Sequence, residues 1–223
     1  MSSFVLVANV NFWQAAYDKL GDYVWKHEHT TKTYYFGLPL QYWTHKSDTN
    51  HMFAFEIYGK REDLYTTHFN SPAMKEFLPA IPDTMTTGLD LRHYENVGGF
   101  LDRFNDKREC EIMTDVRINC KAEARDNVLS RLNTLAEKIK SDGSDDVYTF
   151  FVLKGLDDDQ GVRIFQRFRN WDGSSSLARH PTVLEFWMSS KEEILSMESQ
   201  TYFPNGKGWL HRADKSETRL NIQ

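Results

Sequence analysis

The hydrophobic positions of the chain fall into two successive series of short strands and helices. The stretch from Phe4 to Val10 is short, apolar and rich in β-branched residues, which predicts a strand. A helix should follow, because apolar residues recur at steps of three and four: Trp13, Ala16, Tyr17, Leu20 and Val24. We expect strands at 33–36 and 51–58, a helix from about 62 to 77 and a strand from about 89 to 94. The predicted order is β-α-β-β-α-β.

The second half repeats this order with a clearer helical face. Its helix carries Val128, Leu129, Leu132, Leu135, Ala136 and Ile139 at helical spacing, and strands are predicted at 147–153 and 162–168. Two β-α-β-β-α-β series are typical of an α+β protein with two ferredoxin-like repeats, each an antiparallel sheet with both helices on one face. The uncovered face of one sheet would be covered by the other copy. One continuous mixed sheet is the alternative.

Short sequence matches between the halves support a tandem duplication. Gly-Phe-Leu-Asp-Arg at 99–103 recurs as Gly-Trp-Leu-His-Arg at 208–212, and Ser71-Pro72 recurs as His180-Pro181, both at an offset of 109. The segments 55–58 and 34–36 have weaker partners at 165–168 and 148–150, which are offsets of 110 and 114. We therefore predict domains at 1–103 and 111–215, joined by the charged segment 103–109.

Composition and charge exclude several classes of protein. With 40% hydrophobic and 26% charged residues the chain has the composition of a folded globular protein, and its net charge of −5 argues against a nucleic-acid partner. No apolar run approaches the roughly 20 residues of a membrane span, and the first residues do not resemble a leader, so we expect a cytoplasmic protein. Cys110 and Cys120 are too few for a disulfide framework and are expected to be free thiols.

Aromatic residues make up 14% of the chain, which would suit a site for a flat apolar molecule, although composition alone favours an ordinary aromatic core. The segments that carry a family resemblance are Glu28-His-Thr-Thr31, Tyr34-Tyr-Phe36, Phe55-Glu-Ile-Tyr58 and the helical stretch 64–77 with His68-Phe-Asn-Ser71-Pro. Together they resemble the antibiotic biosynthesis monooxygenase family of the dimeric α+β barrel superfamily. The resemblance implies an intramolecular barrel of two fused repeats, similar to fused barrels of fungal secondary metabolism. A ligand site would lie between each sheet and its own helices.

The second half resembles this family more weakly. It keeps Arg179-His-Pro181 and Glu185-Phe186, but Leu177 stands at the position of His68. We therefore expect a diverged repeat that completes the barrel. A second pocket around Tyr148, Arg179, His180 and Trp187 is the alternative.

The resemblance also implies a chemistry. Members of the family oxidise phenolic or anthrone-like polyketides with O₂ and use no flavin, metal or haem, so the implied partners are an aromatic small molecule and O₂, and the expected cofactor is none. Such a reaction needs a base, hydrogen-bond donors for an enolate oxygen and a dry site. As a pseudo-dimer within one chain, the protein needs no second subunit, although a homodimer is left open.

His68 and Tyr58 are the expected catalytic residues. Free imidazole titrates at about pH 6.5, which suits a base or proton shuttle, and His68 shares a predicted helix face with Leu64. Tyr58 ends the strand that leads to this helix, and its phenol is a candidate donor to an oxyanion. A surface histidine and a core tyrosine are the structural alternatives.

Six further residues are candidates for contact with the substrate: Asn9, Tyr34, Trp43, His51, Phe55 and Phe77. Asn9 interrupts an apolar strand, and a buried amide would need a partner. Trp43, His45 and His51 are assigned to the polar insertion 40–50, which is expected to form a loop at the mouth of the site. Glu56 is expected to play a structural role, paired with Arg163 or Arg167 of the other repeat.

Other functions remain open from the sequence. A polyketide cyclase or isomerase would use the same acid–base pair without O₂, and a non-catalytic barrel would only bind a ligand. Haem-degrading relatives use an Asn, Trp, His set that Asn9, Tyr58 and His68 match only in part. His27 and His29 lack further ligands at metal-site spacing.

Overall fold

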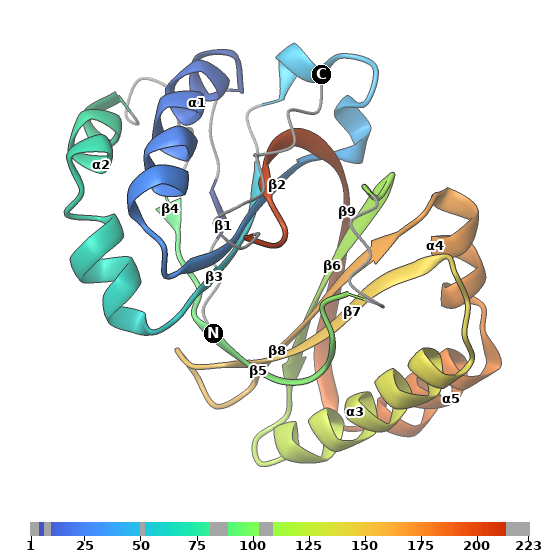
Figure 1. The fold of residues 1–223 in the computed structure, drawn as a ribbon. Helices are drawn as coiled ribbons and strands as arrows, with labels where there is room; N and C mark the ends of the chain where they lie inside the picture. The colour runs from blue at the N-terminus through green and yellow to red at the C-terminus, as the bar shows by residue number, and fades with distance from the viewer. Residues whose placement is uncertain (1–4, 7–9, 50–51, 81–88, 103–108, 213–223) are drawn as a thin grey trace. The chain divides into compact units, whose positions relative to one another are not determined.

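The computed structural model describes residues 5–6, 10–49, 52–80, 89–102 and 109–212. They form two compact units. One is built from two separated stretches of the chain, and the other is the stretch between them. The first comprises residues 1–93 and 204–223, and the second comprises residues 94–203. Both units contain an antiparallel sheet with helices, so the predicted α+β class is confirmed (Figure 1).

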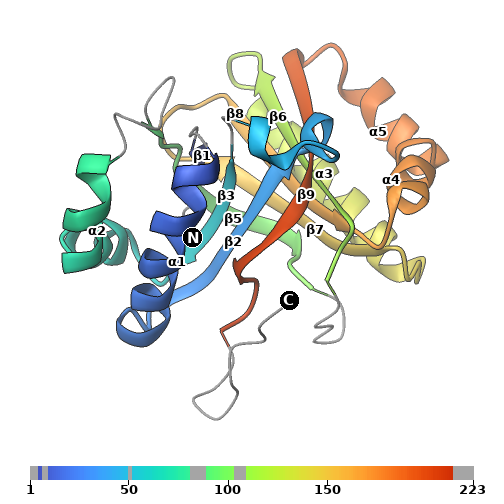
Figure 2. The ribbon, with the colours of Figure 1, turned by 90° about the horizontal axis from the view of Figure 1, so that it is seen from above.

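The first unit follows the predicted β-α-β-β-α-β order. Its elements are β1 (Val5–Leu6), α1 (Val10–His27), β2 (Thr31–Pro39), the 3₁₀ turns η1 (Leu40–Tyr42) and η2 (Lys46–Asp48), β3 (Phe53–Tyr58), the π-helix η3 (Asp63–His68), α2 (Pro72–Phe77), η4 (Leu78–Ala80) and β4 (Leu89–Asp90). Strands β1 and β4 pair with each other, and β3 pairs with β2, which borders the end of β9 (Ile194–Trp209). Helices α1 and α2 lie on the same side of β2 and β3 (Figure 2).

Two boundaries of the first unit differ from the prediction. Val10, expected at the end of the first strand, begins α1 instead. The helix expected over 62–77 is broken into η3 and α2, because Ser71 accepts a hydrogen bond from the Met74 amide as an N-cap and Pro72 follows at the first helical position. The buried face of α1 includes Tyr17, Leu20 and Val24, as the periodicity predicts.

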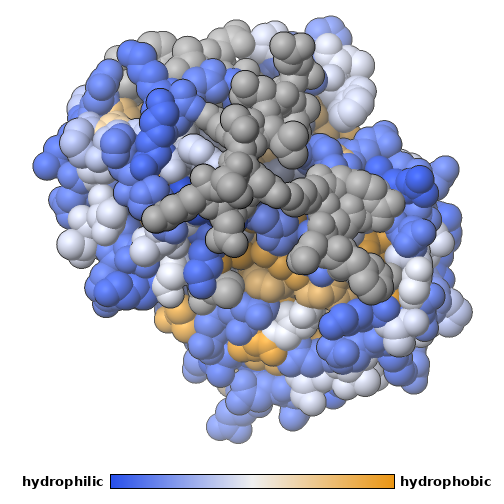
Figure 3. Space-filling view, in the orientation of Figure 1, coloured by the Kyte–Doolittle hydropathy of each residue, from blue (hydrophilic) through white to orange (hydrophobic). Residues whose placement is uncertain are grey.

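The second unit contains a complete ferredoxin-like repeat. Its elements are β5 (Tyr94–Phe100), β6 (Ile112–Cys120), α3 (Arg125–Ser141), β7 (Val147–Gly155), β8 (Gly161–Phe168), α4 (Trp171–Ala178), α5 (Pro181–Ser190) and β9 as far as residue 203. The strand order is β9-β6-β8-β7-β5, with all pairs antiparallel. Every apolar residue predicted on the face of α3 is buried, while the outer surface of this helix is largely hydrophilic (Figure 3).

The two Gly-x-Leu-x-Arg motifs lie where the last strand of each repeat meets the second strand of the other. Gly99, the last residue but one of strand β5, has φ +75°, and a Cβ there would lie 2.0 Å from the carbonyl oxygen of Phe150 on β7. Gly208 near the end of β9 has φ +77°, and its Cβ would lie 1.8 Å from the carbonyl oxygen of Tyr34 on β2. Only glycine tolerates both this backbone conformation and this close approach. The last strand of the first repeat, β5, thus lies beside β7 in the second unit. The end of β9, the last strand of the second repeat, lies beside β2 in the first unit.

A pair of side-chain hydrogen bonds repeats the same arrangement. Thr33 Oγ1 donates to the carbonyl oxygen of Leu210 at 2.6 Å, and Thr149 Oγ1 donates to that of Leu101 at 2.6 Å. These matching contacts confirm the tandem duplication. They also correct one offset, because Thr33 corresponds to Thr149 and the second strands are therefore 116 residues apart rather than 114.

Other predictions have mixed outcomes. The strand predicted over 89–94 is wrong as a single element, because β4 ends at Asp90 and a separate strand, β5, begins at Tyr94. Neither cysteine forms a disulfide, as predicted, and both are buried. Most of the proposed linker, 103–108, lies outside the described residues. None of the helices in the described parts of the chain combines the length and apolarity of a membrane span.

Candidate active site

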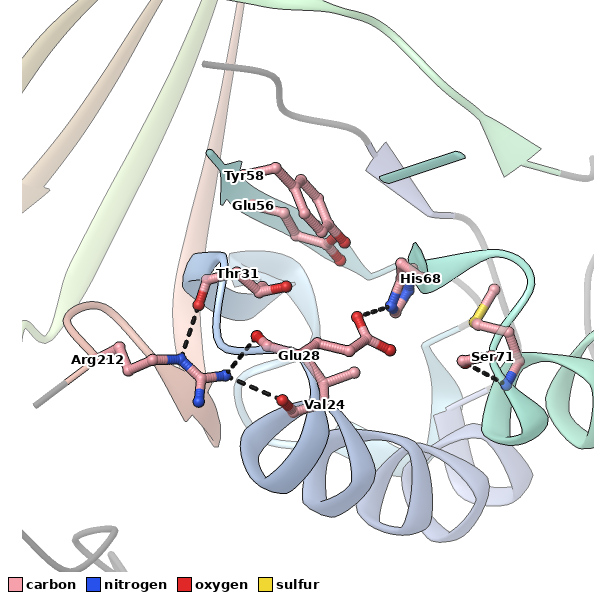
Figure 4. A network of polar contacts seen from close by, with 9 residues as sticks. Val24, Glu28, Thr31, Glu56, Tyr58, His68, Ser71 and Arg212 are labelled. Atoms are coloured by element: carbon pink, nitrogen blue, oxygen red, sulfur yellow. Dashed lines mark hydrogen bonds and ion pairs between the residues drawn. The ribbon is translucent and has the colours of Figure 1, made fainter. Parts of the chain in front are cut away.

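Four ionisable side chains of the first unit are buried together. Glu28, Glu56, Tyr58 and His68 are each at most 3% exposed. Glu28 follows the end of α1, Glu56 and Tyr58 lie on β3, and His68 ends η3 (Figure 4). Burial of ionisable groups is costly unless they have partners, so a cluster of this kind is a candidate functional site.

Strand alternation places the β3 residues of the cluster on the helix-facing side of the sheet. Glu56 and Tyr58 are two residues apart and share one face. Tyr34 of β2 is the direct cross-strand partner of Glu56, and its ring stacks on Tyr17 of α1 with a centroid distance of 5.7 Å. This face is therefore the one covered by α1. Phe55 alternates to the opposite face.

A π-helical turn brings His68 to the same place. The amide of Phe69 donates to the carbonyl oxygen of Leu64, five residues earlier, at 2.9 Å. Such a turn contains one residue more than an α-helical turn, and single π-turns are frequent at functional sites. The ring of His68 lies with its centroid 5.8 Å from that of Tyr34 and 5.8 Å from that of Tyr58.

Glu28 and His68 form a buried pair. His68 Nδ1 lies 2.8 Å from Glu28 Oε2. Since a carboxylate can only accept, Nδ1 is the donor, and this assigns the remaining lone pair of the neutral ring to Nε2. Within the described part of the chain, Nε2 has no hydrogen-bond partner. The pair is arranged as an oriented base.

Glu56 and Tyr58 form the second pair. The Tyr58 hydroxyl donates to Glu56 Oε2 at 2.6 Å. Burial raises the pKa of Glu56 well above its ordinary value, and the charge of Glu28 adds to this, whereas the hydrogen bond from Tyr58 opposes it. Burial, followed by the charge of Glu56, also raises the pKa of Tyr58. The site thus favours the protonated forms of this pair, which are hydrogen-bond donors.

The two pairs face each other. In Figure 4 the head groups of Glu56 and Tyr58 point towards the side on which Glu28 meets His68. Glu28 Oε1 and Thr31 Oγ1 are buried without a hydrogen-bond partner in the described residues. Buried polar atoms are nearly always paired, so unpaired atoms beside a buried acid–base cluster indicate a place for a ligand or for water.

Arg212, near the end of the chain, holds the segment that carries Glu28. Its guanidinium donates to four backbone carbonyl oxygens, those of Val24 at 2.9 Å, Trp25 at 2.6 Å, Glu28 at 3.1 Å and Thr31 at 2.9 Å. The last carbonyl groups of a helix have no partners within it, so this guanidinium caps the C-terminus of α1. The segment that follows β9 at the end of the second repeat thereby supports the site in the first unit.

The structure brings three of the predicted site residues together, namely His68, Tyr58 and Tyr34. Phe55 is buried on the other face of β3, and Phe77 is buried at the end of α2. Trp43 is 47% exposed in the insertion, where Lys46 Nζ lies 5.8 Å from its ring centroid. Asn9 and His51 lie outside the described residues.

The prediction for Glu56 is wrong, because its partner is Tyr58 rather than an arginine. Arg163 instead pairs with Asp115 of its own unit, with Nη2 donating to Oδ2 at 2.7 Å. Arg167 Nη1 donates to Thr149 Oγ1 at 3.5 Å. Glu56 faces the helices of its own unit, where it meets a phenol two residues along the same strand.

Sequence reasoning missed the roles of Glu28 and Arg212. Glu28 comes just after a helix, where a glutamate is normally solvated, and only its place in the segment 28–31 of the family resemblance indicated it. In the sequence, Arg212 stood out only as the last residue of the repeated Gly-x-Leu-x-Arg motif. Both roles depend on contacts between segments far apart in the chain.

The second unit lacks the corresponding cluster. Its repeat carries Phe150, Gln166 and Phe168 at the positions of Tyr34, Glu56 and Tyr58. Gln166 accepts a hydrogen bond from Thr114 Oγ1 at 2.7 Å. His180, considered for a second pocket, caps α5 instead, because its Nδ1 accepts from the Thr182 amide at 3.3 Å.

Across the described ranges, no group of three or more His, Cys, Asp or Glu side chains is placed to hold a metal ion.

Comparisons with known proteins identify the fold. No family model and no curated protein matches the sequence. A structure from Fusobacterium nucleatum subsp. nucleatum, provisionally described as a monooxygenase, aligns over 93% of this chain and 92% of its own with a TM-score of 0.76 at 11% identity. A protein from Lactobacillus acidophilus with the same provisional description aligns over 91% of both chains with a TM-score of 0.65 at 9% identity. An anthrone oxidase-like protein aligns over 91% of this chain and 90% of its own with a TM-score of 0.65 at 12% identity. The chain therefore has the full-length fold of these monooxygenase-like proteins.

Proposed function

We propose that the protein is a cofactor-independent monooxygenase that oxidises an aromatic polyketide or similar phenolic, anthrone-like substrate with O₂ in the synthesis of a secondary metabolite. The observation that carries the proposal is the buried His68, oriented by Glu28 and facing the Tyr58–Glu56 pair. The full-length likeness to an anthrone oxidase-like protein supports this choice of reaction.

His68 is the proposed base. Its Nε2 takes a proton from the acidic CH₂ carbon of the substrate, and the carboxylate of Glu28 stabilises the imidazolium that forms. Tyr58 is the proposed donor to the enolate oxygen: its hydroxyl, neutral in the buried site, turns from Glu56 Oε2 to that oxygen when the substrate binds. Tyr34, whose pKa burial also raises, is a second phenol on the same face.

The resulting carbanion is electron-rich enough to reduce O₂ without a cofactor. One electron passes from the carbanion to O₂, and the two radicals combine with formation of a C–O bond. Protonation gives an organic hydroperoxide, which loses water to leave a carbonyl group. In total the CH₂ group and O₂ become C=O and H₂O, so atoms and electrons balance. The protein supplies proton transfer, oxyanion donors and exclusion of water.

Oxygen consumption with an anthrone or a hydroquinone tests the proposal. We expect uptake by the wild type, a loss of about 100-fold or more in His68→Ala, and a smaller loss in Tyr58→Phe. His45→Ala is the matched control, because His45 is exposed in the insertion and should be dispensable. Wild-type rates in both site variants would remove the site assignment. Product formation under argon would instead identify a cyclase or isomerase that uses the same base.

A further inference from the structure

We propose that Glu56 is the catalytic acid of this site and gives its proton to the oxygen atom that leaves as water. The inference rests on the proposed function, because it assigns the second half of the same reaction. The sequence indicated only a structural role for this residue, and the geometry points to a chemical one.

The hydrogen bonding of Glu56 leaves one carboxyl oxygen available. Oε2 accepts the Tyr58 hydroxyl at 2.6 Å, and Oε1 has no partner within the described residues. The side chain is only 1% exposed, so Oε1 has almost no contact with bulk water. A proton on Oε1 therefore points into the cluster, on the helix-facing side shared with His68.

The two carboxyl groups of the cluster have different partners. Glu28 accepts a hydrogen bond from the imidazole of His68 at 2.8 Å, whereas the partner of Glu56 is a phenol. Two carboxyl groups in one buried site rarely ionise together, and the one whose partner is a weakly acidic phenol rather than an imidazole keeps its proton. The direction of the Glu56 pKa shift agrees with this division of roles.

The proposed step begins at the hydroperoxide carbon. His68 Nε2 removes the remaining C–H proton, the electrons of that bond form the C=O bond, and the O–O bond breaks. The departing hydroxide takes the proton from Glu56 Oε1 and leaves as water. The imidazolium proton then returns to Glu56 through the cluster, which restores both groups. The two protons lost from carbon end in water.

The other repeat offers a natural precedent for a test variant. Gln166 occupies the position of Glu56, so this fold accepts an amide there. In Glu56→Gln, the amide oxygen can still accept the Tyr58 hydroxyl, and only the acidic proton is lost. The variant therefore separates acidity from packing.

The experiment follows O₂ uptake, ketone product and organic hydroperoxide in wild type and Glu56→Gln, with Glu76→Gln as an exposed control. We expect O₂ uptake within a few-fold of wild type, ketone formation lowered about 100-fold or more, and accumulation of the hydroperoxide. Ketone formation at the wild-type rate by folded Glu56→Gln overturns the inference. Absence of O₂ uptake in the wild type itself overturns the proposed function instead.

A second measurement does not depend on the variant. Infrared difference spectroscopy of the wild type at neutral pH should detect the C=O stretch of a buried, protonated carboxylic acid that exchanges slowly with deuterium. Absence of this band in the wild type would show that Glu56 is ionised and would rule out its role as the acid.

Discussion

The Glu28–His68 pair makes the sharpest prediction, through the substitution Glu28→Gln. This change keeps the size of the side chain and removes the charge that faces His68 Nδ1 at 2.8 Å. Both side chains are nearly inaccessible, so solvent cannot replace the lost carboxylate. The imidazolium that forms in proton abstraction then lacks its counter-charge.

The size of the effect follows from the hydrogen bond that is weakened. A hydrogen bond to a charged group is worth about 1.5–3 kcal/mol. Because about 1.4 kcal/mol corresponds to a tenfold change in rate, we expect kcat/KM to fall about 10- to 150-fold. The melting temperature should change little, since the substitution also removes a buried carboxylate whose Oε1 has no partner among the described residues.

The assay is initial-rate O₂ consumption across a range of pH, with a thermal melt of each variant. Glu76→Gln makes the same chemical change at a side chain that is 74% exposed and should behave like the wild type. If Glu28→Gln is folded and retains wild-type kcat/KM, Glu28 does not orient the base, and the reasoning from the 2.8 Å contact is refuted.

Three further predictions concern stability, measured by urea unfolding. Gly208→Ala should lower the free energy of unfolding by about 3 kcal/mol or more, because it adds a steric clash to a left-handed backbone. Gly206→Ala, at φ +73° with open space around it, should lower it by about 1–2 kcal/mol. Equal losses in the two variants would contradict the close approach at Gly208. Arg212→Lys should cost about 2 kcal/mol, because one ammonium cannot serve four carbonyl oxygens, and an unchanged midpoint would show that the cap is dispensable. The stability of wild type relative to Glu56→Gln should fall as pH rises above 4.5, because the folded protein retains a proton that the unfolded chain releases; a difference independent of pH would contradict the raised pKa.

Local patterns in the sequence were sufficient to predict that Tyr58 and His68 lie near each other, but not the partner of Glu56 on the same face of β3. Strand alternation places Tyr58 on one face of β3, and the segment that contains His68 follows directly, so their proximity depends on short stretches of chain. The face of α3 was predicted in full for the same reason. Predictions of this kind need only the period of a helix or a strand.

Interactions between distant segments were not predictable from these periods. Strand β5 contains Gly98 and Gly99, which weaken any strand signal, although the structure needs glycine at 99 for a close backbone approach. Glu28 meets His68 across 40 residues, and Arg212 reaches Glu28 across 184. The repeated Gly-x-Leu-x-Arg motif was the feature of the sequence that pointed to these contacts, and its role is explained only by the fold.

The central claim is that an oriented histidine in a buried acid–base cluster allows O₂ to react directly with an aromatic carbanion. The most direct test is turnover of an anthrone by purified protein under isotope-labelled O₂, with mass analysis of the product. The account predicts one labelled oxygen atom in the new carbonyl group and loss of this labelling activity in His68→Ala. Product that forms without any labelled oxygen would contradict it.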